Sequence, residues 1–94
     1  MDKTKAHELL KLRLGMTSDA MYERLDHLLE AVIKELDDEK GIEVDLENAR
    51  VLEFVISYAA WRYEKKSESA GMPRFIQLDL RNLYLHNKKE RPNV

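Results

Sequence analysis

The placement of glycine is the strongest constraint on what this chain can fold into. Gly15, Gly41 and Gly71 are the only glycines among 94 residues, and each interrupts a run of helix-forming residues. The first proline is Pro73, and runs of β-branched residues are few. Because glycine and proline disfavour helix interiors more than any other residues, the uninterrupted runs predict helices. The predicted fold class is therefore all-α, as a small four-helix domain.

The four helices are expected over about residues 3–14, 17–40, 45–66 and 73–86, so that the two central helices are long and the terminal ones shorter. The second has the clearest helical period, with one apolar face made by Met21, Leu25, Leu28, Leu29, Val32 and Leu36. We expect Thr17-Ser18-Asp19 to cap its start and Ile42 to fold back onto Leu36 at its end. Asp45 is the expected cap of the third helix.

The fourth segment is compatible with two patterns. Phe75, Ile76, Leu80, Leu83 and Tyr84 would line one side of a helix, whereas the alternation of Ile76, Leu78 and Leu80 fits a strand. We favour the helix, with Pro73 in its first turn. Residues 1–86 are then a single helical domain, and residues 87–94 are a mobile charged tail.

Charge is unevenly distributed along the chain. Residues 1–16 have a balance of +2, residues 17–49 a balance of −8 and residues 50–94 a balance of +4. One interpretation is a set of solvated helix faces. The other is electrostatic complementarity between neighbouring copies, which would set their orientation.

Several functional classes lack their characteristic residues. There is no cysteine, and His7, His27 and His86 lie on different segments without a second ligand three or four residues away, so we expect surface histidines and no metal site. Neither a glycine-rich phosphate loop nor a glycine-framed serine is present. We predict no catalytic or cofactor-binding residue, no cofactor and no enzymatic activity. No apolar run reaches the roughly 18–20 residues of a membrane span, so no membrane partner is expected.

The third segment contains FVISYAAWRY at residues 54–63 and has two apolar faces. The first is a core face of Ala49, Leu52, Val55, Ile56, Ala59 and Tyr63. The second is an aromatic strip of Phe54, Tyr58 and Trp61 at i, i+4, i+7 spacing. Either the other three helices enclose this strip, with Trp61 against the fourth, or the strip is a subunit interface, where aromatic residues are enriched.

The order of these elements resembles that of a known protein family. A first helix ends Leu12-Arg13-Leu14-Gly15-Met16, Thr17-Ser18-Asp19 opens the next, and a later helix ends Tyr58-Ala59-Ala60-Trp61-Arg62-Tyr63-Glu64 before Met72-Pro73. Over about residues 6–86, the chain resembles the all-helical head–tail connector (head completion) proteins of tailed bacteriophages and prophages. The resemblance implies an assembly protein without cofactor or enzymatic activity.

The same resemblance implies partners and a location. The protein would form a homo-oligomeric ring between the portal protein and a tail-side completion protein, around the path of the DNA. It would reside at the head–tail junction of the virion, and in the host cytoplasm during assembly.

Two hypotheses assign residues to this function. Phe54, Tyr58 and Trp61 are the candidate subunit interface. Glu23, Glu30 and Asp37, on the acidic face of the second helix, are candidates for the channel face, where they would discourage DNA from sticking. Two other functions stay open: a small helical DNA-binding regulator, which predicts salt-sensitive duplex binding, and a cytosolic adaptor, which predicts a one-to-one complex with a single protein partner.

Overall fold

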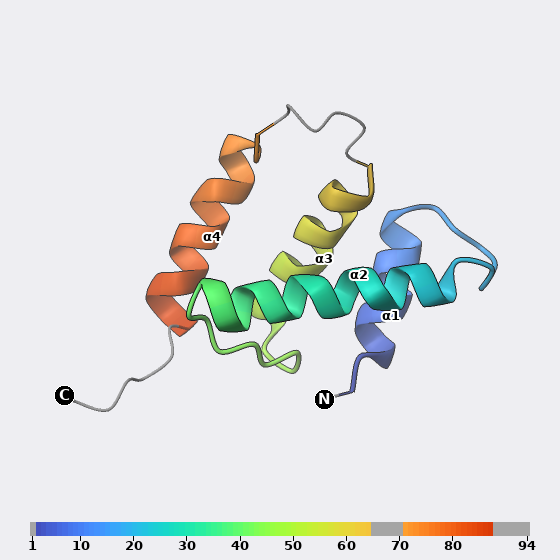
Figure 1. Ribbon diagram of the computed structural model, residues 1–94, viewed down its shortest axis with the longest axis horizontal. Helices are drawn as coiled ribbons and strands as arrows, with labels where there is room; N and C mark the ends of the chain where they lie inside the picture. Colours follow the sequence, from blue (N-terminus) through green and yellow to red (C-terminus); the bar gives the residue numbers. More distant parts are fainter. Residues whose placement is uncertain (1, 65–70, 88–94) are drawn as a thin grey trace.

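The computed structural model describes residues 2–64 and 71–87, and within these ranges it is helical without any strand (Figure 1). The elements are α1 (Thr4–Arg13), α2 (Tyr22–Lys34), η1 (Glu35–Glu39), α3 (Ala49–Glu64) and α4 (Arg74–Asn87). The π-helical segment η1 continues directly from α2. The all-α prediction is confirmed, and residues 75–85 form a helix and not a strand.

The predicted helix lengths hold only in part. The longest α-helix is α3, with 16 residues, and the shortest is α1, with 10. However, α4 has 14 residues and is one residue longer than α2, which has 13 before η1 extends it.

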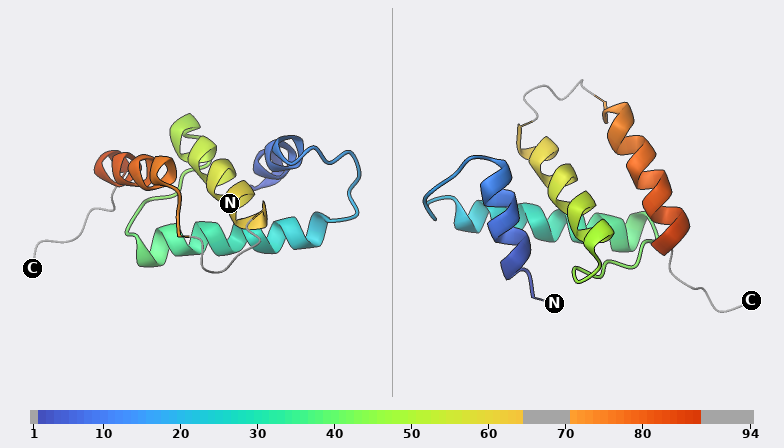
Figure 2. Two further views of the ribbon diagram at one scale, coloured as in Figure 1. Left: turned by 90° about the horizontal axis from the view of Figure 1, so that it is seen from above. Right: turned by 180° about the vertical axis from the view of Figure 1, so that it is seen from behind.

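The helices form two layers. In one layer α4, α3 and α1 lie side by side with α3 in the middle, and α2 crosses one face of this layer (Figure 2, left). The central helix α3 therefore packs against α1, α2 and α4. Three packing partners explain why the sequence of α3 is apolar on most sides, since each partner buries a different strip of it.

The core lies between α2 and the other three helices. The predicted apolar face of α2 is confirmed at its centre, because Leu25, Leu29, Val32 and Leu36 are buried. The core residues from the rest of the chain are Ala6, Leu10, Ile42, Val44, Val51, Leu52, Phe54, Val55, Ile56, Tyr58, Ala59, Ala60, Ile76 and Leu83. Burial of large aliphatic side chains of this kind stabilises the fold by about 1.5–3 kcal/mol each.

Two glycines end helices as the sequence predicts. Gly15, at φ +72°, follows α1, and the amide of Met16 donates to the Lys11 carbonyl at 3.0 Å. This is the Schellman arrangement, in which a left-handed glycine lets the chain bond back onto the last turn. Gly41, at φ +65°, follows η1, and the Ile42 amide donates to the Leu36 carbonyl at 2.9 Å. The predicted fold-back of Ile42 is confirmed, and the bond spans one residue more than usual because η1 is π-helical.

The predicted helix starts are wrong in both central helices. Helix α2 begins at Tyr22, and the Asp19 carboxylate accepts a hydrogen bond from Lys11 Nζ at 2.7 Å instead of capping the helix. In α3 the cap is Asn48, whose Oδ1 accepts from the amides of Arg50 and Val51 at 3.0 and 3.3 Å. The Asp45 carboxylate bonds the amide of Glu47 in the preceding turn. The Asp19 carboxylate is held by a lysine side chain and the Asp45 carboxylate by a turn amide, so neither caps the helix that follows.

The boundary at the C-terminus also differs by one residue. Asn87, assigned above to the tail, is the last residue of α4, and its carbonyl accepts a hydrogen bond from the Glu43 amide at 2.8 Å. The remainder of the predicted mobile tail, residues 88–94, lies outside the described residues, as does the predicted end of the third helix at residue 66.

Candidate interaction surfaces

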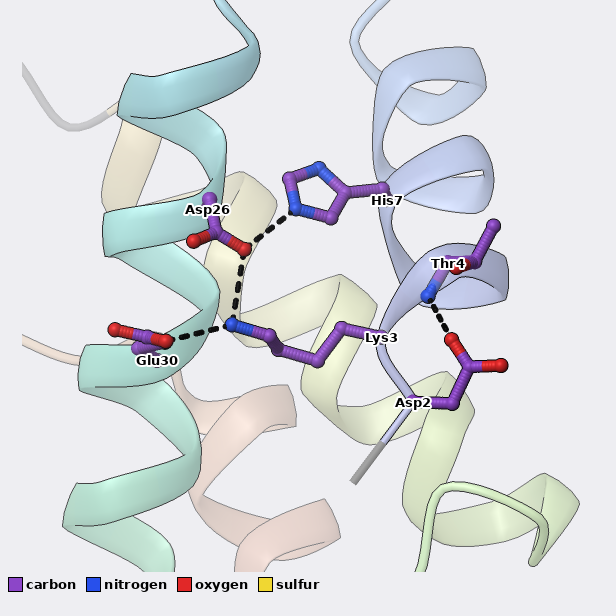
Figure 3. Close-up of polar contacts among 6 residues, drawn as sticks. All are labelled: Asp2, Lys3, Thr4, His7, Asp26 and Glu30. Carbon is purple, nitrogen blue, oxygen red and sulfur yellow. Dashed lines mark hydrogen bonds and ion pairs between the residues drawn. The ribbon is translucent and has the colours of Figure 1, made fainter.

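A polar network joins α1 to α2 (Figure 3). Lys3 Nζ lies 2.9 Å from Asp26 Oδ1 and 2.7 Å from Glu30 Oε1, and His7 Nε2 donates to the same Asp26 oxygen at 2.8 Å. The imidazole of His7 is stacked on Tyr22 at 4.2 Å between ring centroids. His7 is 6% exposed, so its prediction as a surface residue is wrong, whereas His27 and His86 are exposed as predicted.

This network changes the proton affinities of its members. The hydrogen bond from His7, and next the one from Lys3, hold the pKa of Asp26 below its ordinary value. The bond to Glu30 raises the pKa of Lys3. Lys11 lowers the pKa of Asp19 in the same way. The basic N-terminal segment is thus paired with the acidic middle segment inside one molecule, which accounts for part of the charge segregation without a neighbouring copy.

The three channel-face candidates lie along α2 and η1 in different environments. Glu23 is exposed near the start of α2, and Asp37 is half-buried on η1. Glu30 is exposed, and its carboxylate is held by Lys3. The structure places the three residues on one continuous helical rod, and their role at a DNA channel stays a prediction.

The aromatic strip of α3 is largely internal. Phe54 and Tyr58 are each 5% exposed, and Trp61 is half-buried, with its ring 6.0 Å from that of Tyr58. The Tyr58 hydroxyl donates to Glu35 Oε2 at 2.6 Å, and burial, followed by this bond, raises the pKa of Tyr58 to about 12. Of the two alternatives for the strip, enclosure by the other helices holds for Phe54 and Tyr58. The role of the strip as a subunit interface stays a prediction, for which Trp61 offers the accessible surface.

A second apolar surface, which sequence reasoning missed, lies on α4. Phe75, Leu78 and Leu85 are 62%, 50% and 59% exposed, and we call these three residues the α4 outer stripe. The opposite side of α4 faces the core through Ile76 and Leu83. Phe75 and Tyr84, predicted to share one side of the helix with Ile76 and Leu83, are exposed instead. Leu78 and Leu85 are seven residues apart and lie on the side away from Ile76 and Leu83, and Phe75 lies at the edge of this second apolar face, where it borders a hollow with Trp61 of α3.

A third apolar surface is a groove between α1 and α3. Leu9 and Leu12 of α1 and Leu52 and Ile56 of α3 form its apolar lining, and we call it the α1–α3 groove. Leu12 is 73% exposed, the largest fraction among the exposed large apolar residues of the described chain. Seen from behind, α1 and α3 lie side by side in front of α2, with α4 on the far side of α3 (Figure 2, right).

Other kinds of site are not found among the described residues. No group of three or more His, Asp or Glu side chains there is arranged to hold a metal ion. None of the described helices combines the length and apolar character that crossing a membrane requires. In comparisons with known proteins, the chain matches no protein-family model, no curated protein and no solved structure. Its function is therefore argued from the sequence motifs and from the surfaces above.

Proposed function

We propose that this chain is a non-enzymatic assembly protein of the head–tail connector kind, which forms a ring between portal and tail in a tailed bacteriophage or prophage. The observation that carries the proposal is the pair of separate apolar surfaces, the α4 outer stripe and the α1–α3 groove, on either side of α3. Clustered apolar side chains on the surface of a small domain are typical of contacts with other proteins.

Two different contact surfaces on one molecule are compatible with assembly into a ring. A cyclic assembly of more than two copies needs a heterologous contact, in which one surface meets a different surface on the next copy. A single self-complementary surface would instead end the assembly at a dimer. The order of helix ends and motifs, from Leu12–Met16 to Met72-Pro73, supports the connector family among possible ring proteins, and the all-α fold agrees with it.

The acidic face of α2 has a place in this proposal. Glu23 and Glu30 are exposed on α2, the latter beside Lys3, and such carboxylates repel the phosphate backbone of DNA. In a ring around DNA, such a face flanks the channel and leaves the DNA free to move. The portal protein and a tail-side completion protein are the expected partners, with DNA in non-specific proximity.

The proposal is tested by measuring molar mass with light scattering across a range of concentrations, first alone and then with a candidate portal protein. We expect the chain to join the portal in many copies, as a preformed ring or as monomers that order on the portal surface. A monomer or dimer that ignores the portal would contradict the proposal. In that case, salt-sensitive binding to duplex DNA would favour the regulator, and a tight one-to-one protein complex would favour the adaptor.

A further inference from the structure

We infer that the α4 outer stripe of one copy docks into the α1–α3 groove of the next copy. This inference rests on the proposed function in requiring self-association, and it adds the two surfaces that touch. It also moves the expected subunit contact away from Phe54 and Tyr58, because these two side chains are buried within one molecule.

The two surfaces match in length and apolar character. Phe75 and Leu85 are ten residues apart on α4, so the stripe is about 15 Å long at the helical rise. Along α1, the groove runs from Lys5 to Arg13, about 12 Å. A helix that lays a row of apolar side chains into a groove between two others is a common recognition mode. Leu12, which is exposed at the edge of the groove, would be covered by the incoming helix.

The charges beside the stripe differ on its two sides. Arg74 and Arg81 are exposed and border the same surface hollow as Leu78, on the outer side of α4. Asp79 is exposed on the other side, where it borders the hollow between α3 and α4. The stripe therefore has an arginine flank and an aspartate flank.

The rims of the groove carry the opposite charges. Lys5 and Arg13 line the α1 rim, and Glu47 and Glu53 line the α3 rim. All four are exposed. Only one direction of α4 in the groove places the arginine flank over the glutamate rim and Asp79 over the basic rim. Reversing the helix would bring like charges together, which disfavours that direction. Charge complementarity thus selects both the partner, a second copy, and the direction of its α4.

A different contact between copies leaves more apolar surface uncovered. If two α4 outer stripes met about a two-fold axis, the assembly would stop at a dimer and Leu12 would stay exposed. Docking of the stripe into the groove covers both surfaces at every contact and leaves a growing assembly with one free stripe at one end and one free groove at the other.

The test uses two charge-reversal variants and mixes them. The stripe variant carries Arg74→Glu and Arg81→Glu, and the groove variant carries Glu47→Lys and Glu53→Lys. A control variant with Lys34→Glu and Lys40→Glu has the same charge change as the stripe variant at exposed positions on other elements. Helical content by circular dichroism and self-association by sedimentation are measured for each protein, and each is also mixed with a portal protein.

We expect the unaltered chain and the control to self-associate, and each reversal variant to associate at least about tenfold more weakly. Mixing the stripe and groove variants should restore association, because each contact between the two different variants again joins opposite charges. A chain that stays monomeric alone at about 1 mM, a dimer unaffected by the reversals, or a mixture that does not recover would overturn the inference. Binding of the unaltered chain to the portal in any of these cases would leave the proposed function standing.

Discussion

At the scale of single residues, Tyr58 joins α3 to η1 through a hydrogen bond to the Glu35 carboxylate. Hydrogen bonds to charged groups contribute about 1.5–3 kcal/mol. Glu35 is partly exposed and also pairs with Arg62 Nη1 at 3.7 Å, so we expect Tyr58→Phe to lower the free energy of unfolding by about 1.5 kcal/mol, at the low end of this range. Urea denaturation at neutral pH measures this loss. Tyr84→Phe, the same change on the exposed side of α4, is the control and should stay within about 0.5 kcal/mol.

The pH dependence of the stability of Tyr58→Phe tests whether the bond from the neutral phenol is the cause of the loss. Folding raises the pKa of Tyr58 from 10.0 to about 12, so the folded chain holds this proton more tightly than the unfolded chain. The resulting stability is complete below pH 10 and is lost as the pH rises toward 12. Between about pH 10 and pH 12, the unaltered protein should therefore lose more stability than Tyr58→Phe. Equal losses in the two proteins would show that the phenol is not held in its neutral form.

At the scale of elements, a left-handed backbone conformation favours glycine over other residues at two positions. An added Cβ at Gly41 would meet Tyr84 Cε1 at 3.8 Å, an ordinary contact, and one at Gly15 would meet nothing within 4 Å. Substitution by alanine at either position therefore costs backbone strain alone, and we expect each to be destabilising by about 1–2 kcal/mol. Gly71 lacks a positive φ and also has an open Cβ position, so Gly71→Ala is the matched control. Thermal or urea unfolding that ranks all three alike would contradict this assignment.

The existence of the helices could be predicted because it depends on neighbours in the chain. The glycines at 15, 41 and 71 and the hydrophobic period of α2 determine the structure of only a few neighbouring residues. Both features were interpreted correctly. Helix starts were less predictable, since Asp45 and Asn48 both offer a side chain that can cap, and local turns decide which one does. The π-helical turn of η1 has no signal in the sequence that we recognised.

The surfaces depend on tertiary packing, and there the sequence was a weaker guide. Whether Phe54 and Tyr58 face a neighbour or the core is decided by α2–η1 and α4, which lie far from them in sequence. On α4, the rows through Ile76 and through Leu78 are both apolar at helical spacing, and only the docking of α4 on α3 shows which row stays outside. The α4 outer stripe could have been noticed as a second row, but its exposure could not.

At the scale of the whole molecule, the two layers have different kinds of surface. One layer has the apolar contact surfaces and the other has exposed acidic residues. The layer of α1, α3 and α4 holds the α4 outer stripe and the α1–α3 groove, whereas α2 carries exposed acidic residues. Lys3 and His7 reach across to the acidic helix and fasten the layers together. If copies join edge to edge through stripe and groove, the acidic face of every copy is repeated around the assembly.

That repetition leads to the last prediction, which concerns DNA. Glu23→Lys changes the charge by two in each copy at an exposed position of α2, so rings assembled on a portal should retain more duplex DNA, and the gain should fall as salt rises. Glu30→Lys is a less specific variant, because it also removes the partner of Lys3 and places two lysines together. Glu64→Lys makes the same change on α3 and is the control. Filter retention across a salt series measures the effect. No increase for Glu23→Lys, or an equal increase for Glu64→Lys, would show that the acidic face of α2 does not face the DNA.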